Sequence, residues 1–298
     1  MFALGLGDDL VGVSDRCVYP AEAQDLPIVA RGDTLDPRAL LAAAPDLVLA
    51  PAQRTPRRGA TGGHGHGASG AVAEQVSAAA GRADRVDIGD AELAATIRQM
   101  GDDVTLLRLG PTSVEGVLNT IQTVGAMTET EDAALLLVEG LRERLRAVQE
   151  IVVGRRDHDF KPPRVAAIGE LKGPSTTGYW VPEQVRLAGG WELLGTEGAP
   201  AANTTWDAVL EVDPEIVVLM PPGLDLPGTV AAWVKMSRPA GWEAMRAVLE
   251  NRVFAVDGAA YFAQPGPRIV DGIEVLSELI DPIAFDGMSP PESWEHVA

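Results

Sequence analysis

The chain has 298 residues, a formal net charge of −19 and 46% hydrophobic residues. This length allows two compact domains, and the composition lets each bury a core as ordinary globular proteins do. So acidic a surface repels phosphate backbones and argues against nucleic-acid binding. The single cysteine, Cys17, excludes an intrachain disulfide, and no apolar run reaches the roughly 18 residues of a membrane span.

The N-terminal third alternates short strands with helices. Residues 8–13 predict a turn and a strand, and residues 36–44 predict a helix that Asp36 caps and Pro37 begins. The elements expected next are a buried strand at 47–50, a Gly- and Pro-rich loop at 51–70, helices at 71–80 and 90–100, and a strand at 104–109.

The centre of the chain is helical. Residues 113–127 place apolar groups at helical spacing, and Thr130 is positioned to cap a second helix that continues to Val153. At 1.5 Å per residue this second helix is about 35 Å long, enough to span a small domain. A polar linker at 154–163 follows it.

The last part returns to alternating strands and helices, which indicates mainly parallel sheets. The expected strands are 164–169, 216–220 and 252–257, and the expected helices are 182–189, 206–212, 242–250 and 267–280.

An internal echo relates the two halves. Residues 39–51 and 208–221 both read as a short helix, a proline with an acidic residue, an apolar strand and a second proline. We interpret this as duplicated architecture; the alternative is that helix, proline, acid and strand are a common junction. The predicted fold is α/β, with two Rossmann-like lobes of mainly parallel sheet joined by one long spine helix. The predicted parts are an N-terminal lobe at 1–112, a spine at 113–156, a C-terminal lobe at 164–283 and a tail at 284–298.

Two such lobes bind ligands at the loops that follow the carboxyl ends of their strands. All three tyrosines lie in these predicted loops, with a tryptophan and a phenylalanine beside them. Aromatic rings with a polar edge suit a flat, partly hydrated ligand, although the same rings can simply pack the loops onto the lobes. The candidate ligand-binding residues are Tyr19, Tyr179, Trp180, Tyr261, Phe262 and Arg268.

The metal and catalytic candidates are weaker. His64 and His66 lie in the Gly-rich loop, and a zinc site needs three or four ligands in fixed geometry. We therefore favour an insertion without a metal, and we expect no cofactor. No nucleophile elbow, P-loop or dinucleotide fingerprint is present, and Cys17 has no histidine near it in sequence. The sequence thus favours a non-enzymatic binding protein.

Five segments in order resemble the cobalamin-type periplasmic binding proteins, the helical-spine substrate-binding components of ABC importers for cobalamin, siderophores and heme. They are FALGLGDDLVGVSDRCVYP, LDPRALLAAAPDLVLA, TTGYWVPEQVRLAGG, WDAVLEVDPEIVVLMPPGLDL and AYFAQPGPRIVDGIEVL. The resemblance covers most of the chain outside about 52–100. It implies two α/β lobes with a rigid helix between them.

The resemblance also implies roles for single residues. The family's corrin-contacting aromatics would fall on Tyr19, Trp180, Tyr261 and Phe262, while Arg268 lies in the matching Pro-Arg element in either a ligand-contacting or a structural role. The family docks its permease through an acidic residue on each lobe. The matching positions here are Asp207 and Arg38, so one docking charge is reversed.

The expected function is capture of a corrinoid, cobalamin-like ligand for an ABC importer by a monomeric protein. The alternatives are a ferric-siderophore or heme binder, or a cytoplasmic ligand binder or metal chaperone that serves no transporter. The family is extracytoplasmic, whereas this sequence shows no signal peptide and lacks the family's opening strand. Either the start is set too late, or the protein is a cytoplasmic offshoot.

Overall fold

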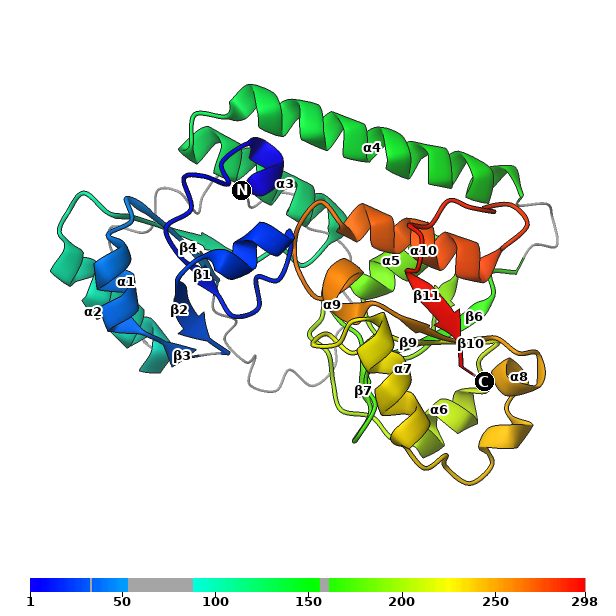
Figure 1. Ribbon diagram of the computed structural model, residues 1–298. Helices are drawn as coiled ribbons and strands as arrows, with labels where there is room; N and C mark the ends of the chain where they lie inside the picture. Colours follow the sequence, from blue (N-terminus) through cyan, green and yellow to red (C-terminus); the bar gives the residue numbers. More distant parts are fainter. Residues whose placement is uncertain (33, 53–87, 156–160, 298) are drawn as a thin grey trace, which may run out of the picture. The chain divides into compact units, whose positions relative to one another are not determined.

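The computed structural model describes residues 1–32, 34–52, 88–155 and 161–297. The chain forms two compact units, which we call the N-unit (Gly7–Gly110) and the C-unit (Met1–Leu6 with Pro111–Ala298). Both contain parallel strands flanked by helices (Figure 1). The predicted α/β fold with mainly parallel sheets and one long helix is confirmed.

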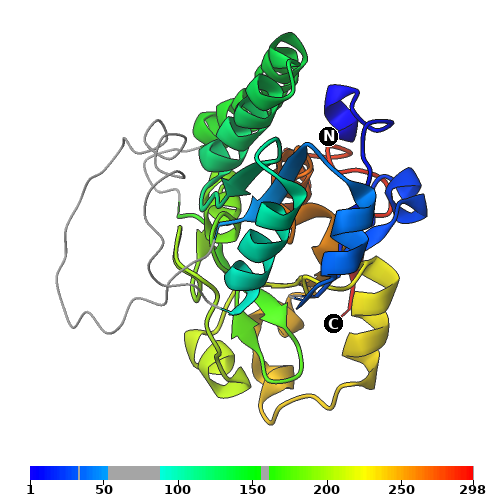
Figure 2. The ribbon, with the colours of Figure 1, turned by 90° about the vertical axis from the view of Figure 1, so that its left-hand side faces the viewer.

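The N-unit contains two small sheets. One has the strand order β1 (Val13–Ser14), β2 (Ile28–Arg31), β3 (Thr34–Leu35), and the other pairs β4 (Leu47–Pro51) in parallel with β5 (Thr105–Leu109). Helices α1 (Pro37–Ala43) and α2 (Ile88–Met100) pack side by side in this unit (Figure 2). The sequence predicted these two helices and the strands β4 and β5, but not the pairing of these strands. The predicted strand at 8–13 is shorter than expected. The predicted helix at 71–80 and most of the loop at 51–70 lie outside the described residues.

The junctions that suggested a duplication share their backbone geometry. Ala44 follows the last residue of α1, and Asp213 follows the last residue of α6 (Trp206–Val212). These two capping residues have φ angles of 46° and 42°. A proline, an acidic residue and a strand follow in each case, namely β4 and β9 (Ile216–Leu219). A left-handed residue before Pro ends the helix and turns the chain into the strand. This shared geometry supports the duplicated architecture.

The C-unit is built on a six-stranded sheet with the order β11-β10-β9-β6-β7, and β8 pairs with β6 beside β7. The strands β6 (Arg164–Glu170), β9 and β10 (Val253–Val256) are parallel to one another and almost wholly buried. Their unbroken apolar runs are typical of strands that are covered on both faces. The short strands are β7 (Ser175–Thr176), β8 (Trp191–Glu192) and β11 (Trp294–His296).

Two helices, α3 (Val114–Met127) and α4 (Glu131–Gly154), pack against each other in the C-unit. Ser113 caps α3 by accepting a hydrogen bond from Gly116. Thr130 occupies the first capping position of α4, but its hydroxyl hydrogen-bonds with that of Thr128 over 3.0 Å rather than with a helix amide. The helix and Thr130 as its capping position are therefore confirmed, although no helix amide donates to the Thr130 side chain.

Helix α4 is tied to α10 (Ile269–Ile280) by one arginine. Arg144 donates to Glu274 over 2.9 Å and also pairs with Asp271. These carboxylates raise the pKa of the guanidinium, so it stays charged. Because α10 also packs on α5 (Val181–Leu187), this contact joins the long helix to the body of the C-unit.

Three tryptophans form the centre of one core cluster in the C-unit. The ring centroids of Trp206, Trp233 and Trp242 lie 5.0 to 5.8 Å apart. Trp233 is completely buried, and the guanidinium of Arg238 lies 3.8 Å from its ring. The cluster packs α6 and α7 (Leu226–Lys235) against the sheet.

Several predictions about the C-unit need correction. Helix α7 was not predicted from the sequence; Asp225 caps it by accepting a hydrogen bond from the Gly228 N–H over 2.8 Å, and Pro227 fits its first turn. The predicted helix at 242–250 is broken at Met245 into a 3-10 turn, Trp242–Ala244, and α8, Arg246–Leu249. The predicted tail includes β11, which pairs antiparallel with β10.

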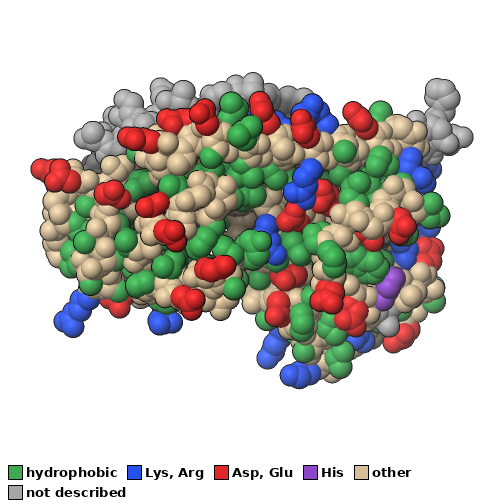
Figure 3. Space-filling model, turned by 45° about the horizontal axis from the view of Figure 1, so that its top comes forward, with side chains coloured by type: hydrophobic (Ala, Val, Ile, Leu, Met, Phe, Trp, Pro, Cys, Tyr) green, Lys and Arg blue, Asp and Glu red, His purple; other side chains and the backbone are tan. Residues whose placement is uncertain are grey.

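Charged side chains of both signs are interspersed on the face shown in Figure 3. None of the described helices combines the length and the apolar character that crossing a membrane requires.

Candidate ligand-binding site

The loops that carry most of the candidate residues follow β6 and β10 in the C-unit. Because β6, β9 and β10 are parallel, the segments after their last residues begin at the same edge of the sheet. The segment after β10 continues into α9 (Gly258–Tyr261). A side chain at Gly258 would meet the carbonyl oxygen of Pro221 at 2.2 Å, so the segments after β9 and β10 are in close contact.

The structure brings Trp180 and Phe262 together. The indole nitrogen of Trp180 donates a hydrogen bond to the Phe262 carbonyl oxygen over 3.0 Å. Trp180 is 6% exposed, Tyr261 9% and Phe262 4%. These rings therefore hold the loops of the C-unit to each other, and little of their surface is open to a ligand in the conformation described.

Gln184 lies beneath this aromatic group and was not anticipated from the sequence. Its side-chain nitrogen donates to the carbonyl oxygen of Ile269 over 2.8 Å and lies 3.4 Å from that of Tyr261. A side chain at Gly272 would come within 2.8 Å of the same nitrogen, so α5 and α10 meet closely here. In the sequence VPEQVRL it stands between Glu183 and Arg186, so nothing in the sequence marks it as a buried residue.

Arg268 and Asp257 give the loop after β10 its charge. The guanidinium of Arg268 lies 4.7 Å from the centroid of the Tyr261 ring. Asp257 accepts a hydrogen bond from Ala260 over 2.7 Å. Burial raises the pKa of Asp257, whereas that hydrogen bond and the charge of Arg268 oppose the rise. Asp257 directly follows a buried strand and precedes glycine, which could have marked it as a capping residue.

Tyr179 differs from its neighbours because it is half-buried and has a left-handed backbone, with φ of 59°. Its ring centroid lies 6.1 Å from that of Trp180. Residues at this conformation are uncommon unless the surrounding structure holds them.

The N-unit contributes one predicted ligand residue, Tyr19. It is 64% exposed, and the peptide bond to Pro20 is cis. Cys17 is also exposed, and its sulfur lies 3.4 Å from the hydroxyl of Ser14. The structure thus presents Tyr19 on the surface of its unit, in contrast to the buried aromatics of the C-unit.

The two docking candidates occupy equivalent positions in their own helices. Arg38 is the second residue of α1 and Asp207 the second residue of α6, and both are exposed. The preceding residues, Asp36 and Thr205, cap these helices through their side chains. The reversal of charge between the two positions therefore lies at matched places on the two units.

The metal candidates His64 and His66 lie outside the described residues. Within the described ranges, no three His, Cys, Asp or Glu side chains gather closely enough to hold a metal ion.

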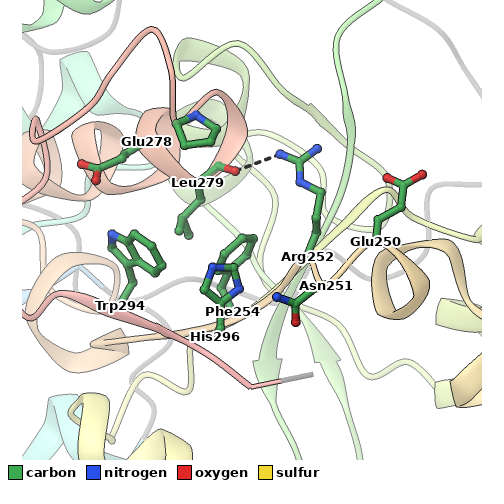
Figure 4. Close-up of a pocket in the computed structure, with 9 residues that line it drawn as sticks. Glu250, Asn251, Arg252, Phe254, Glu278, Leu279, Trp294 and His296 are labelled. Carbon is green, nitrogen blue, oxygen red and sulfur yellow. Dashed lines mark hydrogen bonds between the residues drawn. The ribbon is translucent and has the colours of Figure 1, made fainter.

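A separate pocket of about 290 Å³ opens where β10 begins, at the other end of this strand from the loops above (Figure 4). Phe254, Trp294 and His296 form its aromatic side, and Leu279 lies opposite them. Arg252 donates to the Leu279 carbonyl oxygen over 2.9 Å. None of the predicted ligand residues lines this pocket.

The fold described above, two α/β units with one long helix, is the architecture of the two-lobed periplasmic solute-binding proteins. Comparison with solved structures supports this class. The periplasmic heme-binding protein BhuT in complex with two hemes has a TM-score of 0.67 and 22% identity, with 95% of this chain and 96% of that chain covered. An ABC-type Fe3+-hydroxamate transport system protein from Saccharomonospora viridis has a TM-score of 0.62 and 22% identity, over 94% and 89% of the two chains.

Sequence relatives point to the same class. The uncharacterized ABC transporter substrate-binding lipoprotein YvrC of Bacillus subtilis is 28% identical over 287 residues, which cover 95% of this chain and 77% of that protein. The vitamin B12-binding protein of Vibrio cholerae is 23% identical over 278 residues, with 92% and 82% covered. No protein-family profile matches the chain. Homologues and structural neighbours of this chain are thus ABC substrate-binding proteins of the B12, heme and siderophore type, which confirms the resemblance seen in the sequence.

Proposed function

We propose that this chain captures a corrinoid, cobalamin-like ligand and delivers it to an ABC importer. The observation that carries the proposal is the likeness to the vitamin B12-binding protein, which extends over 92% of the chain. Of the candidate aromatics, Tyr179, Trp180, Tyr261 and Phe262 lie in the segments after β6 and β10, and Tyr19 follows β1. Corrin rings are large and flat, and aromatic side chains bind such surfaces by stacking.

We propose that Tyr19 and Tyr179 contact the ligand directly, because each has an accessible side chain within its own unit. Tyr19 is 64% exposed, and Tyr179 is the least buried aromatic of its loop. Trp180, Tyr261 and Phe262 would then act partly as support, and partly as contacts if their loops move on binding. Arg268 adds a positive charge beside Tyr261, which suits a ligand with carboxylate or amide oxygen atoms.

Heme and ferric siderophores are the alternative ligands. The observation that favours them is the fold, because the solved neighbours include a heme-binding protein and a hydroxamate-system protein at closely similar TM-scores. Heme carries propionates, and hydroxamate siderophores carry oxygen ligands around iron, so Arg268 suits these ligands as well.

The test is direct binding. Purified protein is titrated with cyanocobalamin, hemin and a ferric hydroxamate siderophore, by calorimetry and by visible absorbance after gel filtration. We expect cyanocobalamin to be retained at about one equivalent. Retention of hemin or the siderophore alone would move the assignment to that ligand, and retention of none of the three would overturn the proposal.

The partner follows from the same proposal. The relatives include a lipoprotein and periplasmic proteins, so we propose that the chain works outside the cytoplasm with an importer permease. Asp207 and Arg38 are the proposed docking residues. A chain that binds the ligand but no permease would instead be a free ligand binder or chaperone.

A further inference from the structure

The backbone of Tyr179 is held by a neighbouring segment of the C-unit, residues 193–203. The Tyr179 N–H donates to the carbonyl oxygen of Ala199 over 2.7 Å, and its carbonyl oxygen accepts from Gly198 over 2.8 Å. This reciprocal pair stabilises the left-handed conformation of Tyr179, which is unfavourable for a residue with a side chain. The position of the phenol ring therefore depends on where residues 193–203 lie.

The same segment contacts the loop at two further places. Thr176 donates through its backbone to Ala202 over 2.8 Å, and Ala202 donates back to the Thr176 hydroxyl over 3.0 Å. A side chain at Gly178 would lie 2.3 Å from the nitrogen of Ala201. Close packing on both sides of residue 178 means that the loop and the segment cannot shift independently.

Glu192 directly precedes this segment, and its carboxylate accepts three backbone hydrogen bonds. One oxygen accepts from Leu194 over 3.1 Å and from Gly195 over 3.0 Å. The other accepts from Ala167 on β6 over 3.2 Å. Two short strands, β8 and β7, pair with successive parts of β6: β8 ends at Glu192, and β7 pairs with β6 only from Ile168 onward. The Ala167 N–H of β6 lies between these two pairings and so has no strand partner on that side. The Glu192 side chain takes the place of that partner and continues the hydrogen bonding of the sheet.

Burial controls the charge of this carboxyl group. It raises the pKa of Glu192 to about 7, while the three amides oppose the rise. Charged residues on the elements packed against β8 are Arg164 and Glu170 of β6 and Glu183 and Arg186 of α5, and the segment itself carries Glu197.

These neighbours have other partners. Arg164 donates to the carbonyl oxygen of Val212. Arg186 pairs with Glu197 over 2.6 Å and with Glu183 over 3.4 Å. Removal from water and the backbone amides therefore govern the titration of Glu192.

We infer that Glu192 is a positioning residue for ligand binding, because its carboxyl group holds the first residues of the segment 193–203 and thereby positions Tyr179. The inference rests on the proposed function, in which Tyr179 contacts the ligand. It adds a residue that itself touches no ligand and that makes binding depend on pH.

The direction of that dependence follows from linkage. When residues 193–203 move away, water reaches the carboxyl group and its pKa returns toward the ordinary value of 4.5. We call the described arrangement, in which residues 193–203 cover the Glu192 carboxyl group, closed. Because the pKa of Glu192 is higher in the closed arrangement, that arrangement is favoured at low pH and loses stability as the pH rises through about 7. Opening of the segment should increase from about pH 4.5 to about pH 7 and level off at higher pH.

Amide hydrogen exchange of the ligand-free protein tests the positioning step. In Glu192→Ala, protection of the Tyr179 and Gly198 amides should fall by about tenfold or more, because the three N–H groups lose their acceptor. The amide of Val217 in β9 serves as an internal reference. Glu215→Gln is the matched control, because Glu215 also accepts a backbone hydrogen bond, from Arg164, but lies on a different connection.

Glu192→Gln keeps the shape without the charge and covers the case in which the alanine variant fails to fold. After correction for the intrinsic exchange rate, opening at Tyr179 should rise with pH in the wild type and stay flat in Glu192→Gln. Unchanged protection at Tyr179, or the same pH profile in both proteins, would overturn the inference.

Binding provides the second readout. The wild type should bind cyanocobalamin several-fold more weakly at pH 8 than at pH 6, and Glu192→Gln should show no such change. If Tyr179 becomes mobile in a Glu192 variant but affinity stays intact, the ligand-positioning role is refuted. If the wild type binds no cyanocobalamin, hemin or siderophore, the proposed function fails, while hydrogen exchange still decides whether Glu192 places Tyr179.

Discussion

The indole nitrogen of Trp180 donates to the carbonyl oxygen of Phe262 over 3.0 Å, although the two residues are 82 positions apart in the chain. This bond joins the loop after β7 to the loop after α9. Replacing Trp180 with Phe should keep most of the packing but leave a buried carbonyl without its donor, at a cost of about 1–3 kcal/mol. Urea denaturation measures the loss, and an unchanged unfolding midpoint would show that the bond contributes nothing.

Ligand affinity distinguishes residues that contact the ligand from residues that only support the loops around it. Tyr19→Ala should leave stability within about 0.5 kcal/mol of the wild type, because the side chain is 64% exposed. It should nevertheless weaken binding of the confirmed ligand. Trp180→Ala should weaken binding by about tenfold or more and also destabilise the protein. Calorimetry of both variants gives the comparison, and intact affinity in either one removes that residue from the site.

The tie between α4 and α10 can be tested with two arginines of the same helix. Arg144→Ala leaves Glu274 and Asp271 without their partner, and their side chains are 11% and 20% exposed. We expect a loss of about 2 kcal/mol, reduced from the cost of a fully buried pair because Arg144 itself is 41% exposed. Arg142→Ala is the control.

Arg142 pairs with Glu115, and both side chains are more than a third exposed, at 38% and 57%. Its removal should cost no more than about 0.5 kcal/mol. Equal losses for Arg142→Ala and Arg144→Ala in thermal unfolding would contradict the special role given to Arg144.

Replacing the left-handed residue at each of the two junctions with glycine should change the stability of the protein by different amounts. Ala44→Gly relieves a φ of 46° and removes only a methyl group, so it should stabilise the N-unit by about 1 kcal/mol. Asp213→Gly relieves a φ of 42° but also loses the hydrogen bond that the Asp213 carboxylate accepts from Arg246 over 2.9 Å. Its net effect should be close to zero. A destabilised Ala44→Gly protein, measured by its melting temperature, would argue against this junction geometry.

In the proposed function, docking to a permease involves Arg38 and Asp207. Paired arginines on a permease would meet one acid and one like charge, and like charges at an interface cost several kcal/mol. Either the permease carries an acid opposite Arg38, or docking does not occur. Co-purification with the cognate permease distinguishes these outcomes.

The comparison uses the wild type, Arg38→Glu and Asp207→Ala. Tight binding by the wild type that is lost in Arg38→Glu would show a re-matched interface. Binding by Arg38→Glu alone would show that the charge reversal separated this protein from transport.

The fold was largely predictable because its main strands and helices carry strong local signals. The apolar runs at 164–169 and 216–220 and the Asp36 cap were all found where they were expected. The short strands were not predictable, because β8 has two residues and depends on hydrogen bonds to β6. Helix α7 was missed because Pro and Gly in its first turn resemble a loop signal.

The candidate site was only partly predictable for a related reason. The sequence places Trp180 and Phe262 in loops, but it gives no indication that a hydrogen bond joins them and buries both rings. Glu192 was equally hidden, since a glutamate next to an exposed tryptophan is typical of a surface edge strand. Only the folded structure shows that its carboxylate accepts hydrogen bonds from three backbone amides.

The tryptophan cluster has a spectroscopic consequence. All six tryptophans lie in the C-unit, three of them within 5.8 Å of another tryptophan, while Gly7–Gly110 contains none. Fluorescence excited at the red edge of tryptophan absorption therefore reports the C-unit alone. Tyr19 is the sole tyrosine of the N-unit, whereas Tyr179 and Tyr261 lie in the C-unit with the tryptophans. Tryptophan emission is thus a natural reporter of the C-unit, and it allows unfolding of that unit to be followed without an added label.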